Sequence, residues 1–260
     1  MSTTKIRKPH PFDSPLHKVE RGVPSLSRDG VRMAVILAWL LLLVSPVFAQ
    51  AIWSGPTDKR VVALTFDDGP NFEGSTELLD ILDKYGVKAT FFVIGREVEQ
   101  NPDVIYRMSD YGHEVGNHTY SHARLGDFSR VDIEEGVKRT NLLISDITGE
   151  KPKCFRPPGG TTSAALSYDI EQMGMSVVCW TINAEDYTED SDAFEIEENY
   201  QKIADELKEK VLSEAKPGAI ILLHNGSKQT LLALPGIIEG LRGFGYGFVT
   251  VSELLSKGDY

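Results

Sequence analysis

The stretch Val61-Val-Ala-Leu-Thr-Phe-Asp-Asp-Gly-Pro70 decides the fold class, because it joins an apolar run of strand length to an acidic turn. Residues 61–66 are mostly β-branched, apolar or aromatic, a composition that favours a β-strand. Asp67 and Asp68 follow where this strand should end, and Gly69-Pro70 then turns the chain. At a strand end the turn can bring both carboxylates to one mouth, where one could bind a metal ion and the other accept a proton.

Further apolar runs follow, and amphipathic stretches separate them, which predicts alternating strands and helices. Such alternation implies parallel strands joined by right-handed crossovers, in an α/β barrel or an open doubly wound sheet. No linker interrupts the pattern, so we expect one domain over 52–260. The predicted strands are 61–66, 89–94, 114–117, 154–156, 176–182, 219–223 and 248–250, and the predicted helices are 76–85, 102–111, 129–147, 163–172, 194–215 and 229–242.

The N-terminal residues predict export. Residues 1–32 carry seven Lys or Arg against three acids and show no apolar periodicity, so we expect a disordered basic leader. An apolar run over 33–44, the Ser45-Pro46 break and the small residue Ala49 then form a signal-peptide pattern over 33–51. The alternatives are an uncleaved membrane anchor with its basic end in the cytoplasm, or a buried helix. With a signal or an anchor, the body is secreted, periplasmic or held outside the cytoplasmic membrane.

Composition excludes other classes of protein. The net charge is −11, and the excess of acids lies in the body, which argues against a nucleic-acid partner because phosphate binding needs a basic face. Two cysteines are too few for a disulfide framework. Cys154 and Cys179 lie near the ends of two predicted neighbouring strands, and we expect buried thiols, with a disulfide as the alternative. No protein partner is inferred.

Four more polar motifs follow predicted strands. His118-Thr-Tyr-Ser-His122 places two imidazoles four residues apart, and on a helical turn they would share a face and hold one metal ion. Phe155-Arg-Pro-Pro-Gly-Gly160 is a rigid turn followed by glycines that let the backbone approach a ligand. The other two motifs are Trp180-Thr-Ile-Asn-Ala-Glu-Asp-Tyr187 and Ile220-Ile-Leu-Leu-His224.

The five motifs agree in position, because each lies at the carboxyl end of a predicted strand, where barrels carry their sites. Two histidines and one aspartate give three ligands and leave an open position, as in catalytic zinc sites. A second aspartate and a further histidine remain as base and acid. Together they predict a metal-assisted hydrolase.

In this order, TFDDGP, HTYSH, RPPGG, WTINAEDY and ILLH resemble the five motifs of the NodB-homology polysaccharide deacetylases, carbohydrate esterase family four. The resemblance extends over roughly three quarters of the chain. It implies a distorted (β/α) barrel, often of seven parallel strands, and removal of N-acetyl groups from N-acetylglucosamine polymers such as peptidoglycan or chitin. The implied cofactor is Zn²⁺, with Co²⁺ and other divalent metals accepted.

The resemblance also implies a role for each matching residue. The catalytic group would comprise a general base, its positioning residue, an oxyanion-binding backbone N–H and a general acid: Asp67, Arg156, Gly159 and His224. The metal ligands would be Asp68, His118 and His122, and the substrate-binding residues Leu222, Tyr187 and Pro158.

Two positions depart from the family pattern. Tyr often stands where this chain has Gly159, so one wall of the groove is lost although the backbone donor remains. The fourth motif commonly has aspartate where this chain has Asn183, so Asp186 would have to tune the acid histidine, or that histidine has a lower pKa. The acids after Asp186 predict a solvated loop, or alternatively an acidic border of the groove.

The leading interpretation is therefore an exported, metal-dependent deacetylase of an acetylated amino-sugar polymer. An acetyl-xylan esterase or a small-amide hydrolase on the same fold is the alternative within enzymes. A catalytically inactive glycan-binding module is the alternative of another class.

Overall fold

The computed structural model describes residues 50–124, 129–186 and 197–256. The predicted leader over 1–32 and nearly all of the hydrophobic segment over 33–51 lie outside these residues and stay predictions. Among the helices that are described, none combines the length and hydropathy needed to cross a membrane.

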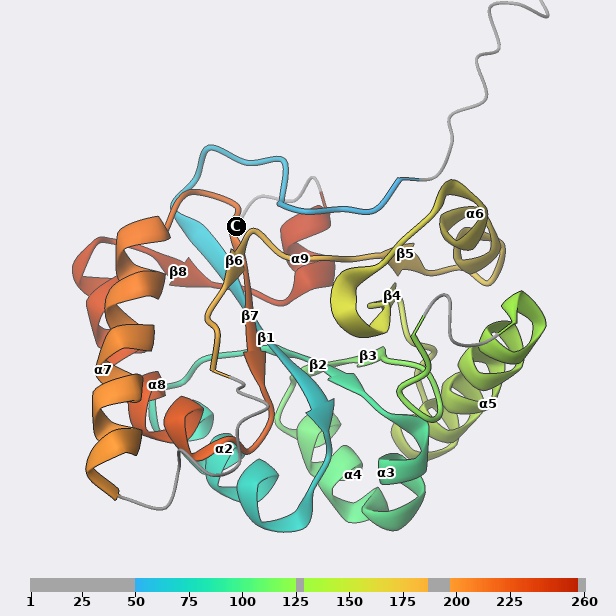
Figure 1. Cartoon of the computed structure of the whole chain (residues 1–260), viewed down its shortest axis with the longest axis horizontal. Helices are drawn as coiled ribbons and strands as arrows, with labels where there is room; N and C mark the ends of the chain where they lie inside the picture. The colour runs from blue at the N-terminus through green and yellow to red at the C-terminus, as the bar shows by residue number, and fades with distance from the viewer. Residues whose placement is uncertain (1–49, 125–128, 187–196, 257–260) are drawn as a thin grey trace, which may run out of the picture. The chain divides into compact units, whose positions relative to one another are not determined.

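The described strands form a curled sheet whose pairings are all parallel, which confirms the predicted distorted barrel (Figure 1). Seven strands follow one another across the sheet in the order β5-β4-β3-β2-β1-β7-β6, and β8 pairs with the first residues of β1. The strands are β1 (Val61–Gly69), β2 (Thr90–Val93), β3 (Glu114–Asn117), β4 (Cys154–Phe155), β5 (Ser176–Val177), β6 (Ile182–Asn183), β7 (Ile220–His224) and β8 (Gly247–Phe248).

The predicted strand over 176–182 is wrong in one respect, because it is divided between two edges of the sheet. β5 pairs with β4, whereas β6 pairs with β7, so the barrel is open between them. The residues between β5 and β6 bond instead to a segment that precedes β1: the Cys179 N–H donates to Ile52 O at 2.7 Å. The Thr181 N–H then donates to Ile220 O at 2.8 Å, which begins the pairing with β7.

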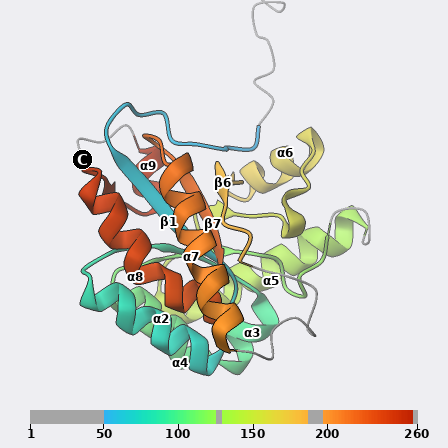
Figure 2. The same cartoon turned by 60° about the vertical axis from the view of Figure 1, so that its left-hand side comes forward.

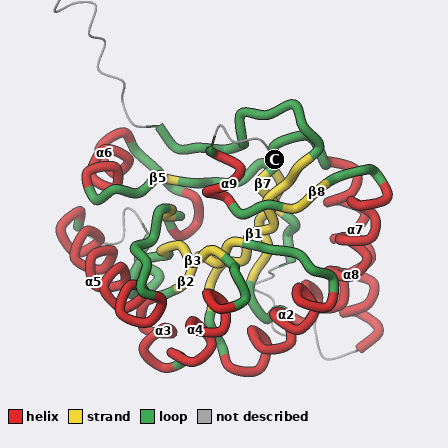
Figure 3. Tube along the Cα trace, turned by 180° about the vertical axis from the view of Figure 1, so that it is seen from behind, coloured by secondary structure: helices red, strands yellow, loops and turns green. Residues whose placement is uncertain are grey.

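The helices other than α9 lie outside the curled sheet (Figure 1 and, from behind, Figure 3), whereas Val251 and Leu254 of α9 pack in the apolar cluster of the barrel interior. Helices α7 and α8 pack against each other in front of β7, as Figure 2 shows. Two short helices, α3 and α9, have no counterpart in the prediction, because five or six residues are too few for a periodic pattern. The helices are α2 (Phe72–Lys84), α3 (Gly95–Gln100), α4 (Pro102–Asp110), α5 (Arg130–Thr148), α6 (Ala164–Gln172), α7 (Glu197–Glu214), α8 (Lys228–Gly243) and α9 (Val251–Leu255), and a 3₁₀ turn spans Pro158–Gly160.

The side chains of β1 contribute to the outer core, to the barrel interior and to the candidate site. Its side chains alternate between two faces. Val62, Leu64 and Phe66 belong to the large core between the sheet and the outer helices. Val61 and Ala63 point to the barrel interior, where they join a smaller apolar cluster. The same inner face continues with Thr65 and Asp67, so the interior changes from apolar at the amino end to polar at the carboxyl end of the strand.

We predict that Gly116→Ala destabilises the protein by about 1–3 kcal/mol, the usual effect of an added methyl group in a packed core. A Cβ at Gly116 in β3 would lie 2.8 Å from the buried Phe92 ring and 3.1 Å from Cys154 O. Gly243→Ala, at the end of α8, is the matched control, since its added methyl would meet no side chain and no other part of the described chain within 4 Å, apart from the adjacent residues and the backbone of its own helix. Equilibrium urea unfolding measures both variants, and equal stabilities would contradict this packing.

Candidate active site

A bulge at the carboxyl end of β1 places the neighbouring carboxylates of Asp67 and Asp68 in the same cleft. The pairing register between β1 and β2 shifts between Asp67 and Gly69. At this shift Asp68 adopts a left-handed backbone conformation, with φ of 72°. For a residue other than glycine this conformation costs about 1–3 kcal/mol and is common at functional sites. The pairing of β1 with β7 sets Asp67 directly beside His224.

The two histidines after β3 lie on a loop, so the prediction that they share a helical turn is wrong. Thr119 and His122 both have positive φ, at 66° and 60°. The loop is fixed to α3, because Thr119 O and Tyr120 O accept hydrogen bonds from the first two N–H groups of that helix, at 2.9 and 3.0 Å. The imidazoles of His118 and His122 nevertheless converge, with ring centroids 5.2 Å apart.

Asp68, His118 and His122 form a group whose geometry fits a divalent metal ion. One oxygen of Asp68 lies 3.4 Å from His118 Nε2 and 3.2 Å from His122 Nε2. The ligand atoms of all three side chains lie within 4.8 Å of one another. The Asp68 oxygen is buried and has no well-aligned hydrogen bond from the described residues. One oxygen and two nitrogens are a donor set that zinc accepts.

The orientation of His118 strengthens this fit. Its Nδ1 lies 2.7 Å from Arg156 O, and since a carbonyl only accepts, the Nδ1–H must donate. This bond leaves the lone pair of Nε2 directed at Asp68. Metal-binding histidines are commonly held in this way by a backbone carbonyl.

Charge and burial set the protonation of this group in the absence of an ion. Burial raises the pKa of Asp68, but the imidazoles of His118, His122 and His224 outweigh burial and bring it down to about 2. Burial also lowers the pKa of His122. The carboxylate is therefore ionised at neutral pH, which is the state that a metal ligand needs.

A buried arginine holds the other carboxylate. Arg156 follows β4 and is completely buried. Its Nη1 donates to Asp67 Oδ1 at 2.7 Å and to Thr65 Oγ1 at 2.8 Å, and its other nitrogens donate to the backbone oxygens of Val178 and Cys179. The second carboxylate oxygen of Asp67, Oδ2, lies 3.8 Å from His118 Nε2. Asp67 is therefore fixed beside the candidate metal ligands.

The third acidic group of the site is Asp186, which pairs with His224 in place of Asn183. His224 Nδ1 lies 2.7 Å from Asp186 Oδ1, and the other Asp186 oxygen accepts from the His224 N–H and from Thr230. Burial lowers the pKa of His224, but the hydrogen bond to Asp186 and the nearby carboxylates raise it to about 9. Asn183 instead accepts from the Glu185 N–H.

These groups line an open cleft of about 500 Å³ at the carboxyl ends of the strands. Leu222 and Gly159, both expected there, are among the lining residues, while Pro158 is buried in the 3₁₀ turn and is not. Tyr187 and the acids over 189–196 lie outside the described residues. The cleft is lined by Asp67, Asp68, Ile94, Arg96, Glu97, His118, His122, Arg124, Gly159, Trp180, Asn183, Glu185, Leu222 and His224.

Several supporting residues had escaped the sequence analysis. Thr230 holds Asp186, and Thr65 shares Arg156 with Asp67. Neither has a sequence signature of its own, although Thr65 lies within the first motif. Cys154 and Cys179 are buried free thiols, as expected, and burial raises the pKa of both.

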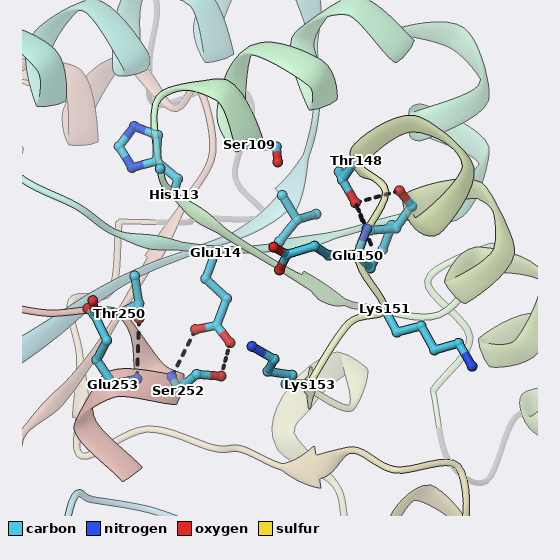
Figure 4. A pocket seen from close by; sticks show the side chains of 13 residues that line it. Ser109, His113, Glu114, Thr148, Glu150, Lys151, Lys153, Thr250, Ser252 and Glu253 are labelled. Atoms are coloured by element: carbon cyan, nitrogen blue, oxygen red, sulfur yellow. Dashed lines mark hydrogen bonds between the residues drawn. The ribbon is translucent and has the colours of Figure 1, made fainter. Parts of the chain in front are cut away.

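A second polar cavity, of about 330 Å³, lies at the amino end of β3 and has a different character (Figure 4). Two of its carboxylates, those of Glu114 and Glu253, are bonded within the protein. Glu114 accepts from Ser252 and from Thr90, and Glu253 accepts from the Thr250 N–H at 2.7 Å. These bonds attach α9 to the base of the sheet, so this cavity has a structural role.

Comparison with known proteins agrees with this geometry. A family model described as polysaccharide deacetylase matches residues 54–178. The chain is 34% identical over 206 residues to a peptidoglycan-N-acetylglucosamine deacetylase of Bacillus cereus, covering 78% of this chain and 92% of that protein. It is 34% identical to the peptidoglycan-N-acetylglucosamine deacetylase PgdA of Listeria monocytogenes, with 91% of this chain aligned, but it spans only 48% of that relative's length. It is 37% identical to the peptidoglycan-N-acetylmuramic acid deacetylase PdaC of Bacillus subtilis, covering 76% of this chain and 39% of that one.

Solved structures share the fold. The Bc1960 peptidoglycan N-acetylglucosamine deacetylase superposes with a TM-score of 0.71 at 30% identity, covering 80% of this chain and 94% of that chain. BA3943 of Bacillus anthracis, described as a CE4 family pseudoenzyme, has the same TM-score and identity and covers 80% and 70% of the two chains. The sequence, the fold and the near-complete coverage of the Bacillus cereus relative together show that this chain belongs to the polysaccharide deacetylase family.

Proposed function

We propose that this chain is an exported, metal-dependent hydrolase that removes N-acetyl groups from the amino sugars of a peptidoglycan-like polymer. One observation carries the proposal. A candidate metal site, formed by Asp68, His118 and His122, lies close to both an arginine-held carboxylate and a histidine paired with a buried aspartate. This arrangement offers a metal site, a base and an acid within one open cleft.

A divalent ion held by Asp68, His118 and His122 would act as a Lewis acid and make a water molecule more nucleophilic. Asp67 accepts a proton as that water attacks the acetyl carbonyl, and Arg156 keeps Asp67 oriented. The Gly159 N–H donates to the oxyanion that develops. His224, held by Asp186, gives a proton to the departing nitrogen as the C–N bond breaks, which yields acetate and a free amine.

The substrate class and the location rest on separate support. The cleft is open to solvent, as a polymer substrate requires, and the named relatives act on peptidoglycan. The basic leader and apolar segment over 1–51 favour export to the compartment that contains such polymers.

A pseudoenzyme on the same fold is the competing hypothesis, since BA3943 is such a case. The test is acetate release from peptidoglycan, chitin oligomers and acetyl-xylan, with zinc or cobalt and with a chelator. We expect chelator-sensitive release from the amino-sugar polymers. No release from any substrate in the presence of metal would contradict the proposal, and release from xylan alone would favour the esterase.

We predict that His118→Ala loses metal and activity together, because two protein ligands remain where tight zinc binding needs three or more. Calorimetric titration with Zn²⁺ measures the first effect and acetate release the second. His113→Gln serves as a control, since His113 lies outside the cleft. Full activity of metal-free His118→Ala would overturn the ligand assignment.

Asp67→Asn should retain metal but lose about 10²–10⁴-fold in kcat, the usual range for one proton-transfer group. The asparagine oxygen can still accept a hydrogen bond from Arg156, and thermal unfolding checks that the variant is folded. A kcat equal to that of the wild type would remove Asp67 from the role of base.

A further prediction concerns the protonation of His224. In the metal-free protein its imidazolium should persist at neutral pH and be lost as the pH rises through about 9. Asp186→Asn removes the hydrogen-bonded carboxylate and leaves burial opposed only by the charges of Asp67 and Asp68, so the pKa of His224 should fall below about 9. Asn183→Ala is the matched control and should leave the pKa unchanged. Nuclear magnetic resonance titration of labelled histidine distinguishes these cases, and an unshifted pKa in Asp186→Asn would contradict the pairing.

A further inference from the structure

Arg124 is an exposed cation in the cleft that the proposed chemistry does not use. It lies two residues after His122 and lines the cleft together with Asp67, Asp68 and Gly159. A Cβ built on Gly159 would have Arg124 Nε at 3.7 Å and Cδ at 3.9 Å as its nearest neighbours. Because Gly159 has no side chain, it does not cover the aliphatic part of the Arg124 side chain, which remains open to the cleft.

The other charged groups of the cleft have partners within the protein. Arg96 Nε lies 3.0 Å from Glu97 Oε1, and Glu185 Oε1 lies 2.6 Å from Lys210 Nζ. Asp67 pairs with Arg156 in the same way. Within the described ranges, Arg124 takes part in no ion pair, so its guanidinium can receive an anion from outside.

Arg124 lies in the same cleft as the residues that would hold the metal. Its side chain lines this cleft together with those of Asp68, His118 and His122. Opposite charges attract most strongly where neither is already paired, so Arg124 is a cation of this cleft that can attract an acidic sugar.

We propose that Arg124 binds a carboxylate carried by the amino sugar whose acetamide is hydrolysed, and so favours acidic glycans over neutral ones. This rests on the proposed function. A planar guanidinium binds a carboxylate through two parallel hydrogen bonds. In an amino sugar, the carbon next to the nitrogen-bearing carbon carries an oxygen, so an acid attached there lies close to the acetamide. N-acetylmuramic acid has this chemistry: its carboxylate is free when no peptide is attached, whereas an attached peptide converts it to an amide and supplies carboxylates of its own.

The test compares three substrates with the metal-loaded enzyme: neutral chitin oligomers, glycan strands stripped of peptide, and strands that retain their peptides. Arg124→Gln should lower kcat/KM on the acidic strands about 10- to 100-fold, as expected for a charged hydrogen-bonded pair. Its activity on chitin oligomers should stay within about twofold. Arg124→Lys keeps the positive charge but lacks the planar pair of donors, so its kcat/KM on the acidic strands should lie between those of the wild type and Arg124→Gln. Arg107→Gln, on α4 and paired with Asp80, removes the same charge outside the cleft and should change neither activity.

The pattern of loss identifies the source of the carboxylate. Loss on the stripped strands assigns the carboxylate to the sugar and supports the inference, whereas loss only on the peptide-bearing strands would place it on the peptide and overturn the inference. Equal loss on neutral and acidic substrates, or no loss on either, would overturn the inference while leaving the proposed deacetylase intact. Strand binding is measured in parallel by calorimetry. An inactive wild type would therefore contradict the proposed function alone, and the effect of Arg124→Gln on binding would still decide the inference.

Discussion

The rest of the site depends on how the buried charge of Arg156 is satisfied. Its guanidinium has no exposure to solvent, contacts the Phe92 ring and bonds to β1 and to the open edge of the barrel. Removing one partner of such a buried pair costs about 3–5 kcal/mol, because the other charge is left uncompensated. The pair between Arg156 and Asp67 therefore fixes the end of β4 against β1. The backbone carbonyl of Arg156 also orients the imidazole of His118.

Because of this constraint, the adjacent carboxylates of Asp67 and Asp68 have different partners and different proposed roles. Asp67 is neutralised from behind by Arg156, whereas the bulge directs Asp68 toward the imidazoles of His118 and His122. The same sequence pair thus yields one carboxylate suited to proton transfer and one suited to metal binding. At the amino end of the sheet the equivalent polar groups, such as Glu114, are bonded internally and hold α9 in place.

The sequence predicted that Asp67, Asp68, His118, His122 and His224 lie together, because parallel strands end at one edge and each motif followed a strand. It did not predict the loop that carries His118 and His122, since the positive φ of Thr119 and His122 leaves no compositional signal. Nor could it divide 176–182 into two strands, because that break depends on a pairing with Ile52, far away in the chain. The choice of Asp186 over Asn183 likewise depends on the path of the backbone after β6.

Anomalous diffraction from crystals of the full chain soaked with Zn²⁺ tests the central claim most directly. The account predicts one peak, about 2.0–2.2 Å from Asp68, His118 and His122, with Asp67 still paired with Arg156 and outside the coordination shell. A peak bound by Asp67 with the arginine pair broken, or no peak at these three residues, would contradict it.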